Sequence, residues 1–178
     1  MLRLSSIRSI ELDAPVDSDS GQTTGDLIAA PKSQSQFIFD QEQARVRAIS
    51  LLQEKITDPE TRLILQMRTN NGKLREIAAQ SSLSLKSPQG IANRFVEGTL
   101  ALKAIIGIES GRFPHENDKE LLMDYFGLYG KSKVFPGHLA FEYSMDTQTL
   151  RAEIERLLAK VGEEDLDRVV DQLRVHRR

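Results

Sequence analysis

Apolar residues recur at helical spacing through most of this chain, and no stretch shows the strict alternation of a half-buried strand. The first run predicts a helix over residues 40–55, with one side formed by Ile38, Val46, Ile49, Leu52 and Ile56. The spacing returns after each later turn, and the last run consists of Leu166, Val169, Val170 and Leu173. The sequence therefore predicts an all-α fold.

Short polar motifs predict where the helices begin. Thr57-Asp58-Pro59-Glu60 combines a capping side chain, a first-turn proline and an acidic residue at the positive end of a helix dipole. Similar residues precede four later apolar runs, at Ser87-Pro88, Asn117-Asp118, Pro136 and Asp146. Between the helix start at Thr57 and the one at Ser87, Asn70-Asn71-Gly72 ends one helix, and a short helix is expected over residues 73–81.

These helices fall into two groups of three, and the second group repeats the plan of the first at an offset of roughly 60 residues. In each group a turn precedes the last helix, which is the helix-turn-helix layout whose last helix can lie in a major groove. We expect an extended, partly disordered linker (1–36), a helix-turn-helix domain (37–107), a second such domain (108–162), and an amphipathic helix with a basic tail (163–178).

Charge is unevenly distributed along the chain, although the net charge is only -2. Residues 1–43 hold three basic and seven acidic side chains, whereas residues 44–107 hold ten basic and five acidic ones. Residues 108–162 and 163–178 are again slightly acidic. A basic segment behind an acidic leader indicates that one part of the chain meets phosphates while another avoids or mimics them. The alternative is an evenly solvated surface.

Several function classes are disfavoured. The chain has no cysteine, which excludes disulfides, thiol catalysis and zinc ribbons and fits a cytoplasmic location. No apolar run is long enough to cross a membrane. Residues 125–132 end like a phosphate-binding loop, but Tyr125 stands where the motif needs glycine. The histidines lack metal-ligand spacing and no catalytic triad can be assembled, so we expect no enzyme, no metal and no cofactor.

The acidic leader carries a recognisable pair of motifs. Residues 11–16 read Glu-Leu-Asp-Ala-Pro-Val, and residues 25–28 read Gly-Asp-Leu-Ile. This arrangement resembles the linker of bacterial sigma-70 family RNA polymerase sigma factors. The residues that follow are similar to sigma region 4, the promoter-reading domain, because Leu74-Arg75-Glu76-Ile77 and residues 87–102 match its helix-turn-helix. The second repeat aligns more weakly with the same region.

The chain departs from the sigma pattern in three respects. Its first turn is longer by residues 84–86. Its expected recognition helix has Pro88, Gln89, Gly90, Ala92 and Asn93 where the family usually has arginine, glutamate, arginine, arginine and glutamine. The chain therefore lacks guanidinium groups that contact guanine and phosphate. Nothing in the chain resembles region 2, the part that melts promoter DNA.

The resemblance implies which residues meet each partner. In the family the linker enters the active-site cleft of the polymerase, so the expected polymerase-binding carboxylates are Asp13, Asp17, Asp19 and Asp26. The expected DNA contacts are Lys73, Arg75, Lys86, Gln89, Asn93 and Arg94 in the first domain, and Gln148, Thr149 and Arg151 in the second. The alternatives are a solvated linker, ordinary exposed side chains, and a second repeat that binds protein alone.

These observations predict a sigma-like transcription factor that binds bacterial-type core RNA polymerase and double-stranded promoter DNA, with no membrane partner. Because region 2 is absent, a separate subunit bearing region 2 would have to melt the promoter. Two other functions stay open: an adaptor or antagonist that displaces the host sigma factor from polymerase, and a stand-alone helix-turn-helix DNA-binding regulator.

Overall fold

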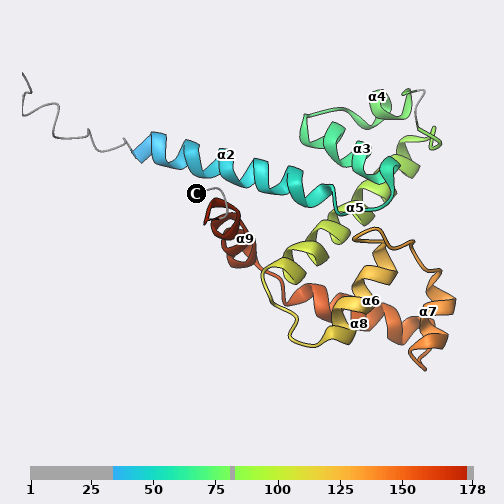
Figure 1. Ribbon diagram of the computed structural model, residues 1–178. Coiled ribbons are helices and arrows are strands. Elements are labelled where there is room, and N and C mark those ends of the chain that lie inside the picture. The colour runs from blue at the N-terminus through green and yellow to red at the C-terminus, as the bar shows by residue number, and fades with distance from the viewer. Residues whose placement is uncertain (1–33, 81–82, 176–178) are drawn as a thin grey trace, which may run out of the picture. The chain divides into compact units, whose positions relative to one another are not determined.

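A computed structural model describes residues 34–80 and 83–175, and all regular secondary structure in those residues is helical (Figure 1). This confirms the all-α prediction. The helices are α2 (Gln34–Gln53), α3 (Pro59–Thr69), α4 (Leu74–Ala78), α5 (Pro88–Glu109), α6 (Glu116–Phe126), α7 (Pro136–Glu142), α8 (Thr147–Ala159) and α9 (Glu163–Val175). None of these helices combines the length and apolar content needed to cross a bilayer.

The chain divides into two compact units, residues 1–40 and 41–178, with the division inside α2. In the first unit the described residues are the first turns of α2, where Ile38 and Phe39 are exposed. The expected linker over residues 1–36 lies almost wholly outside the described residues. The second unit contains the rest of α2 and all of the other helices.

Side-chain caps start three of the helices where the sequence predicts them. The carboxylate of Asp58 accepts hydrogen bonds from the amides of Glu60 and Thr61 at 3.4 and 3.0 Å. Ser87 accepts one from the Gly90 amide at 3.0 Å and thereby caps α5. Asp146 caps α8 by accepting one from the Thr149 amide at 2.8 Å. Each cap satisfies an amide that has no partner within its own helix.

The predicted start of α6 is wrong by two residues. The helix begins at Glu116, and His115 rather than Asn117 is its N-cap residue. His115 has an extended backbone and makes no side-chain capping bond. Asp118 lies instead in the first turn, where its negative charge is equally favourable at the positive end of the helix dipole. An acidic residue in the sequence therefore predicts the first turn of a helix but does not identify its N-cap residue.

The long helix α5 organises the second compact unit. It packs against α3 and α4 towards its beginning and against α6, α8 and α9 towards its end (Figure 1). A small cluster joins α3, α4 and α5 through Ile64, Ile77, Ala78, Leu83 and Ile91. A larger cluster runs from Leu52 on α2 to Val169 on α9 and includes residues of α3, α5, α6, α7 and α8. The predicted domain boundary between residues 107 and 108 lies inside α5, and residues on both of its sides share this larger cluster.

Ion pairs from Arg112 and Arg45 attach α9, the predicted C-terminal amphipathic helix, to the rest of the unit. The fully buried carboxylate of Asp165 accepts two hydrogen bonds from Arg112 Nε, at 3.0 and 3.1 Å, and one from the Gly162 amide at 2.9 Å. The guanidinium of Arg45 on α2 donates to Asp167 at 2.6 and 2.9 Å. Together with buried Val169 and Val170, these contacts hold α9 against α5 and α2.

Candidate nucleic-acid interface

The two predicted three-helix groups differ in the connection that precedes their last helix. In the first group, residues 79–87 join α4 to α5. In the second, residues 143–146 join α7 to α8, which is the turn of about three or four residues typical of a helix-turn-helix. Ser144 in this shorter turn has a left-handed backbone, with φ of 54°. The longer first turn agrees with the sequence prediction, and the second group has the shorter connection.

In the first group most of the predicted DNA contacts are exposed but already hydrogen-bonded. The Lys86 ammonium donates to the carbonyl of Gln80 at 2.7 Å, just beyond the end of α4. On the first turns of α5 the Gln89 side-chain amide donates to Asn93 Oδ1 at 2.9 Å. Lys73, the N-cap residue of α4, lies 3.7 Å from Glu76. Exposed Arg75 is different, because its side chain makes no hydrogen bond or ion pair with any described residue.

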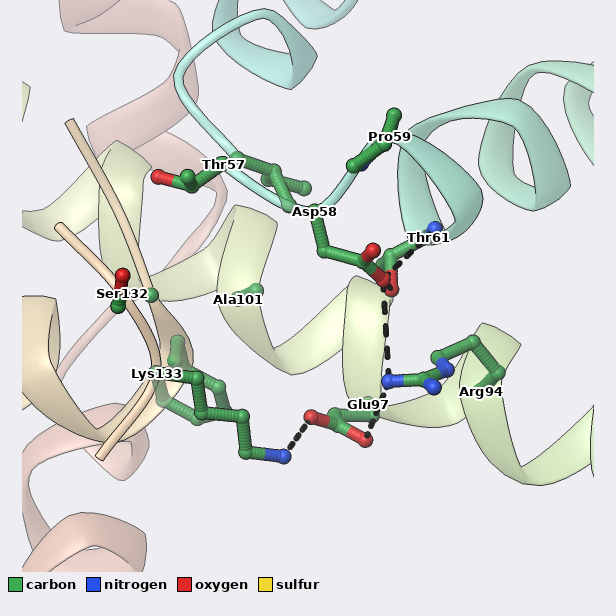
Figure 2. Close-up of a pocket in the computed structure, with 12 residues that line it drawn as sticks. Thr57, Asp58, Pro59, Thr61, Arg94, Glu97, Ala101, Ser132 and Lys133 are labelled. Carbon is green, nitrogen blue, oxygen red and sulfur yellow. Dashed lines mark hydrogen bonds and ion pairs between the residues drawn. The ribbon is translucent and has the colours of Figure 1, made fainter. Parts of the chain in front are cut away.

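Arg94 lies on the other side of α5 and faces carboxylates rather than solvent. Figure 2 shows its guanidinium between Asp58 and Glu97, at 3.7 and 4.0 Å. Glu97 also pairs with Lys133 from the segment after α6. Burial opposes ionisation of Asp58, but hydrogen bonds from the Thr61 hydroxyl and amide and the nearby Arg94 charge hold its pKa below the usual range. Arg94 is thus part of an internal ion-pair chain.

This ion-pair chain borders a cavity of about 260 Å³ that the sequence did not predict. Its walls come from the start of α3, the middle of α5 and the segment after α6 (Figure 2). Ile56, Ala101 and Phe126 supply apolar surface, and Thr57 and Ser132 supply hydroxyl groups. Two cations and two carboxylates surround the cavity, so its charges compensate one another. The lining residues come from segments that are far apart in sequence, so no single local motif predicts the cavity.

The segment that resembles a phosphate-binding loop forms one side of this cavity and has a structural role. Its amides donate within the protein: Leu128 to Met123 at 3.0 Å, Tyr129 to the Lys55 carbonyl at 2.7 Å, and Gly130 to Thr57 Oγ1 at 3.1 Å. The Tyr129 hydroxyl donates to Glu109 at 2.6 Å. Burial and this carboxylate raise the pKa of Tyr129. The loop therefore ties α5 and the α2–α3 connection to α6.

The predicted contacts of the second group lie at the beginning of α8. Gln148, Thr149 and Arg151 are all exposed. The Thr149 hydroxyl donates to Asp146 at 2.9 Å, so this side chain completes the helix cap. The side chains of Gln148 and Arg151 form no hydrogen bond or ion pair with any residue that the structure describes. Their polar groups are therefore available to an external partner.

Two exposed aromatic residues flank α7 and were not among the predicted site residues. Phe135, the N-cap residue of α7, is 73% exposed, and Phe141 near its other end is 85% exposed. The Phe135 ring meets the His138 imidazole edge-on, with centroids 6.4 Å apart. Exposed phenylalanines next to an interaction helix are a common feature of protein-binding surfaces. Helical spacing alone gave no signal for them, since it does not distinguish an exposed phenylalanine from a buried one.

The predicted polymerase-binding carboxylates, Asp13, Asp17, Asp19 and Asp26, lie outside the described residues. Within the described ranges, no three acidic or histidine side chains come close enough to hold a metal ion. Comparison of this chain with protein-family models, curated proteins and solved structures finds no significant match. The functional assignment therefore depends on the residues themselves.

Proposed function

We propose that this chain is a sigma-like transcription factor of the cytoplasm, which binds bacterial-type core RNA polymerase and double-stranded promoter DNA. The observation that carries the proposal is the helical arrangement of α7 and α8. The turn between them has helix-turn-helix length, and the exposed first turns of α8 carry polar side chains without internal partners. This element belongs to the same compact unit as the basic residues 44–107.

The polymerase half of the proposal rests on the leader sequence. Residues 11–16 and 25–28 resemble the sigma linker, and their carboxylates match a channel that binds phosphates. Because no segment resembles region 2, the proposed factor cannot open a promoter by itself and depends on a subunit bearing region 2. Core polymerase with this protein alone should give no transcript from a duplex promoter, and robust initiation would contradict this dependence.

The proposal is tested by two measurements on the full chain. Tagged protein mixed with core polymerase should retain the polymerase subunits through washing. Its affinity for promoter duplexes should fall steeply between about 50 and 200 mM salt, because binding releases counterions from phosphates. A factor that retains no polymerase subunit but keeps salt-dependent DNA affinity is a stand-alone regulator. Absence of both interactions contradicts every version of the proposal.

An antagonist of the host sigma factor is a second candidate, favoured by the exposed Phe135 and Phe141 and by the slight negative charge of residues 108–162. Such a protein uses its surfaces to hold polymerase and has no need of DNA. Competition binding distinguishes the two functions. An antagonist displaces sigma from core enzyme and shows no salt-dependent promoter affinity, whereas the proposed factor shows that affinity.

A further inference from the structure

We infer that α8 reads the bases of the proposed DNA site and that α5 does not, although α5 is the helix that matches the sigma recognition helix in sequence. The inference rests on the DNA-binding half of the proposed function. Within the second compact unit, the basic first group of helices attracts phosphates, and the second group contributes the side chains that select the DNA sequence.

The polar side chains at the beginning of α5 already have partners within the chain. Gln89 and Asn93 hydrogen-bond to each other along the helix. Arg94 pairs with Asp58 and Glu97 at the border of the cavity (Figure 2). To contact a base edge, Arg94 must break its ion pairs with Asp58 and Glu97. Gln89 and Asn93 must likewise break the hydrogen bond between their side chains. A side chain that exchanges one partner for another gains less on binding than one with no partner in the free protein.

The beginning of α8 holds two side chains in the opposite condition. Gln148 and Arg151 are exposed and have no internal partner among the described residues. Because they are three residues apart, they lie on neighbouring parts of one helix face, next to exposed Ala152 and Glu155. Arginine binds guanine through two hydrogen bonds, glutamine binds adenine likewise, and a carboxylate accepts from cytosine. This face therefore carries groups that distinguish base pairs.

The turn geometry favours the same helix. Residues 143–146 give α7 and α8 the close connection that lets the first helix cross the backbone while the second enters the groove. In the first group residues 79–87 intervene, and Lys86 within them is bonded to the Gln80 carbonyl. Hence α4 and α5 lack the short turn on which groove insertion depends.

Local charge at α8 is close to neutral, so phosphate attraction must come from elsewhere in the unit. The basic segment supplies it, since the side chains of Arg47, Arg75 and Lys103 form no ion pair or hydrogen bond with any described residue. Side chains of this kind fix a protein on the duplex without reading its sequence. Both groups belong to one compact unit and share a core cluster, so the charge and the reading helix act together.

The test uses the full chain and duplexes selected by it from a random pool. Arg151→Ala and Gln148→Ala should each weaken binding to the selected sequence by roughly 5- to 150-fold while leaving binding to unselected DNA within about twofold. Arg75→Ala should weaken binding to both kinds of DNA equally and lower the salt slope by about one. Arg156→Ala is the matched control, because Arg156 lies on α8 but is paired with Glu153. It should change neither affinity beyond about twofold.

Variants of α5 test whether this helix, rather than α8, reads the bases. The double variant Gln89→Ala, Asn93→Ala should retain full discrimination between selected and unselected DNA. If it loses discrimination while Arg151→Ala keeps it, α5 is the reader and the inference is overturned, whereas the proposed function stands. If the unaltered chain binds no duplex at low salt, DNA binding itself is contradicted and the inference fails with it. Helicity measured by circular dichroism confirms that each variant is folded.

Discussion

At the scale of single residues, one carboxylate in the fold is completely shielded from water. Asp165 is fully buried, and its position at the start of α9 lets it accept from the Gly162 amide and from Arg112 together. Burial alone would favour the neutral acid, but these donors outweigh it and lower the pKa of Asp165. The charged form is therefore the form that holds α9 in place.

This lowered pKa predicts an acid-sensitive attachment of α9. Because the folded-state pKa is below the unfolded value of about 3.9, the stabilisation is complete above that value and is lost as the pH falls through the folded pKa. Asp165→Asn should lower the unfolding free energy by about 2 kcal/mol at pH 7. The unfolding free energy of this variant should also fall less between neutral and acidic pH than that of the unaltered chain. Urea denaturation between neutral and acidic pH measures both effects.

The control for this variant is Asp171→Asn, because Asp171 is exposed and only 3.8 Å from exposed Arg174. It should change the unfolding free energy by less than about 0.5 kcal/mol. Equal losses for the two variants would show that the Arg112 contact contributes nothing beyond a surface pair.

At the scale of elements, the proposed DNA binding depends on the short turn between α7 and α8. Ser144 has φ of 54°, a backbone region in which a side chain crowds the following carbonyl. Glycine has no such penalty. We expect Ser144→Gly to raise the unfolding free energy by about 0.5–1 kcal/mol without changing DNA affinity, as measured by thermal melts and binding titrations. Ser50→Gly, inside helix α2, should instead lower stability by about 1 kcal/mol.

A second element-scale prediction concerns how closely α5 is packed. A Cβ atom on Gly107 would lie 2.4 Å from the Phe113 ring and 2.7 Å from Val161. Both neighbours are buried, so neither can move without disturbing the core. Gly107→Ala should therefore cost about 1–3 kcal/mol.

The matched control is Gly137→Ala in α7. There the nearest atom belongs to the exposed Phe135 ring at 3.3 Å, which can shift into solvent. This variant should be neutral or stabilising by up to about 1 kcal/mol. A Gly107→Ala protein as stable as the unaltered chain would mean that α5 approaches Phe113 less closely than the structure describes.

Helix starts were predictable because a cap is a local interaction between residues a few positions apart. Asp58, Ser87 and Asp146 each cap the helix expected of them. Helix ends were less predictable, because a helix continues as far as tertiary packing supports its last turns, as packing on α6, α8 and α9 does for α5 up to Glu109. The short helix α4 ends at Ala78, before the predicted residue 81.

At the scale of the whole molecule, several ion pairs and hydrogen bonds join residues that lie far apart in the sequence. Arg112 and Asp165, Lys55 and Glu109, and the ion-pair chain around the cavity each connect segments distant along the chain. The sequence predicted Arg94 as a DNA contact because it is a cation on an expected reading helix. The structure gives it carboxylate neighbours that helical spacing could not reveal. Tertiary pairing therefore decides which predicted contacts have a free functional group.

The central claim is that the acidic leader lies inside a transcribing polymerase while the helical unit behind it binds DNA. Because the chain has no cysteine, Asp17→Cys creates a single thiol for a crosslinker. Bound to core polymerase, this variant should crosslink to the subunits that form the active-site cleft, and a cysteine placed at exposed Gln148 should not. Replacing Asp13, Asp17, Asp19 and Asp26 by asparagine should weaken polymerase retention. The claim is contradicted if Asp17→Cys yields no cleft crosslink and the neutralised leader retains polymerase as well as the unaltered chain does.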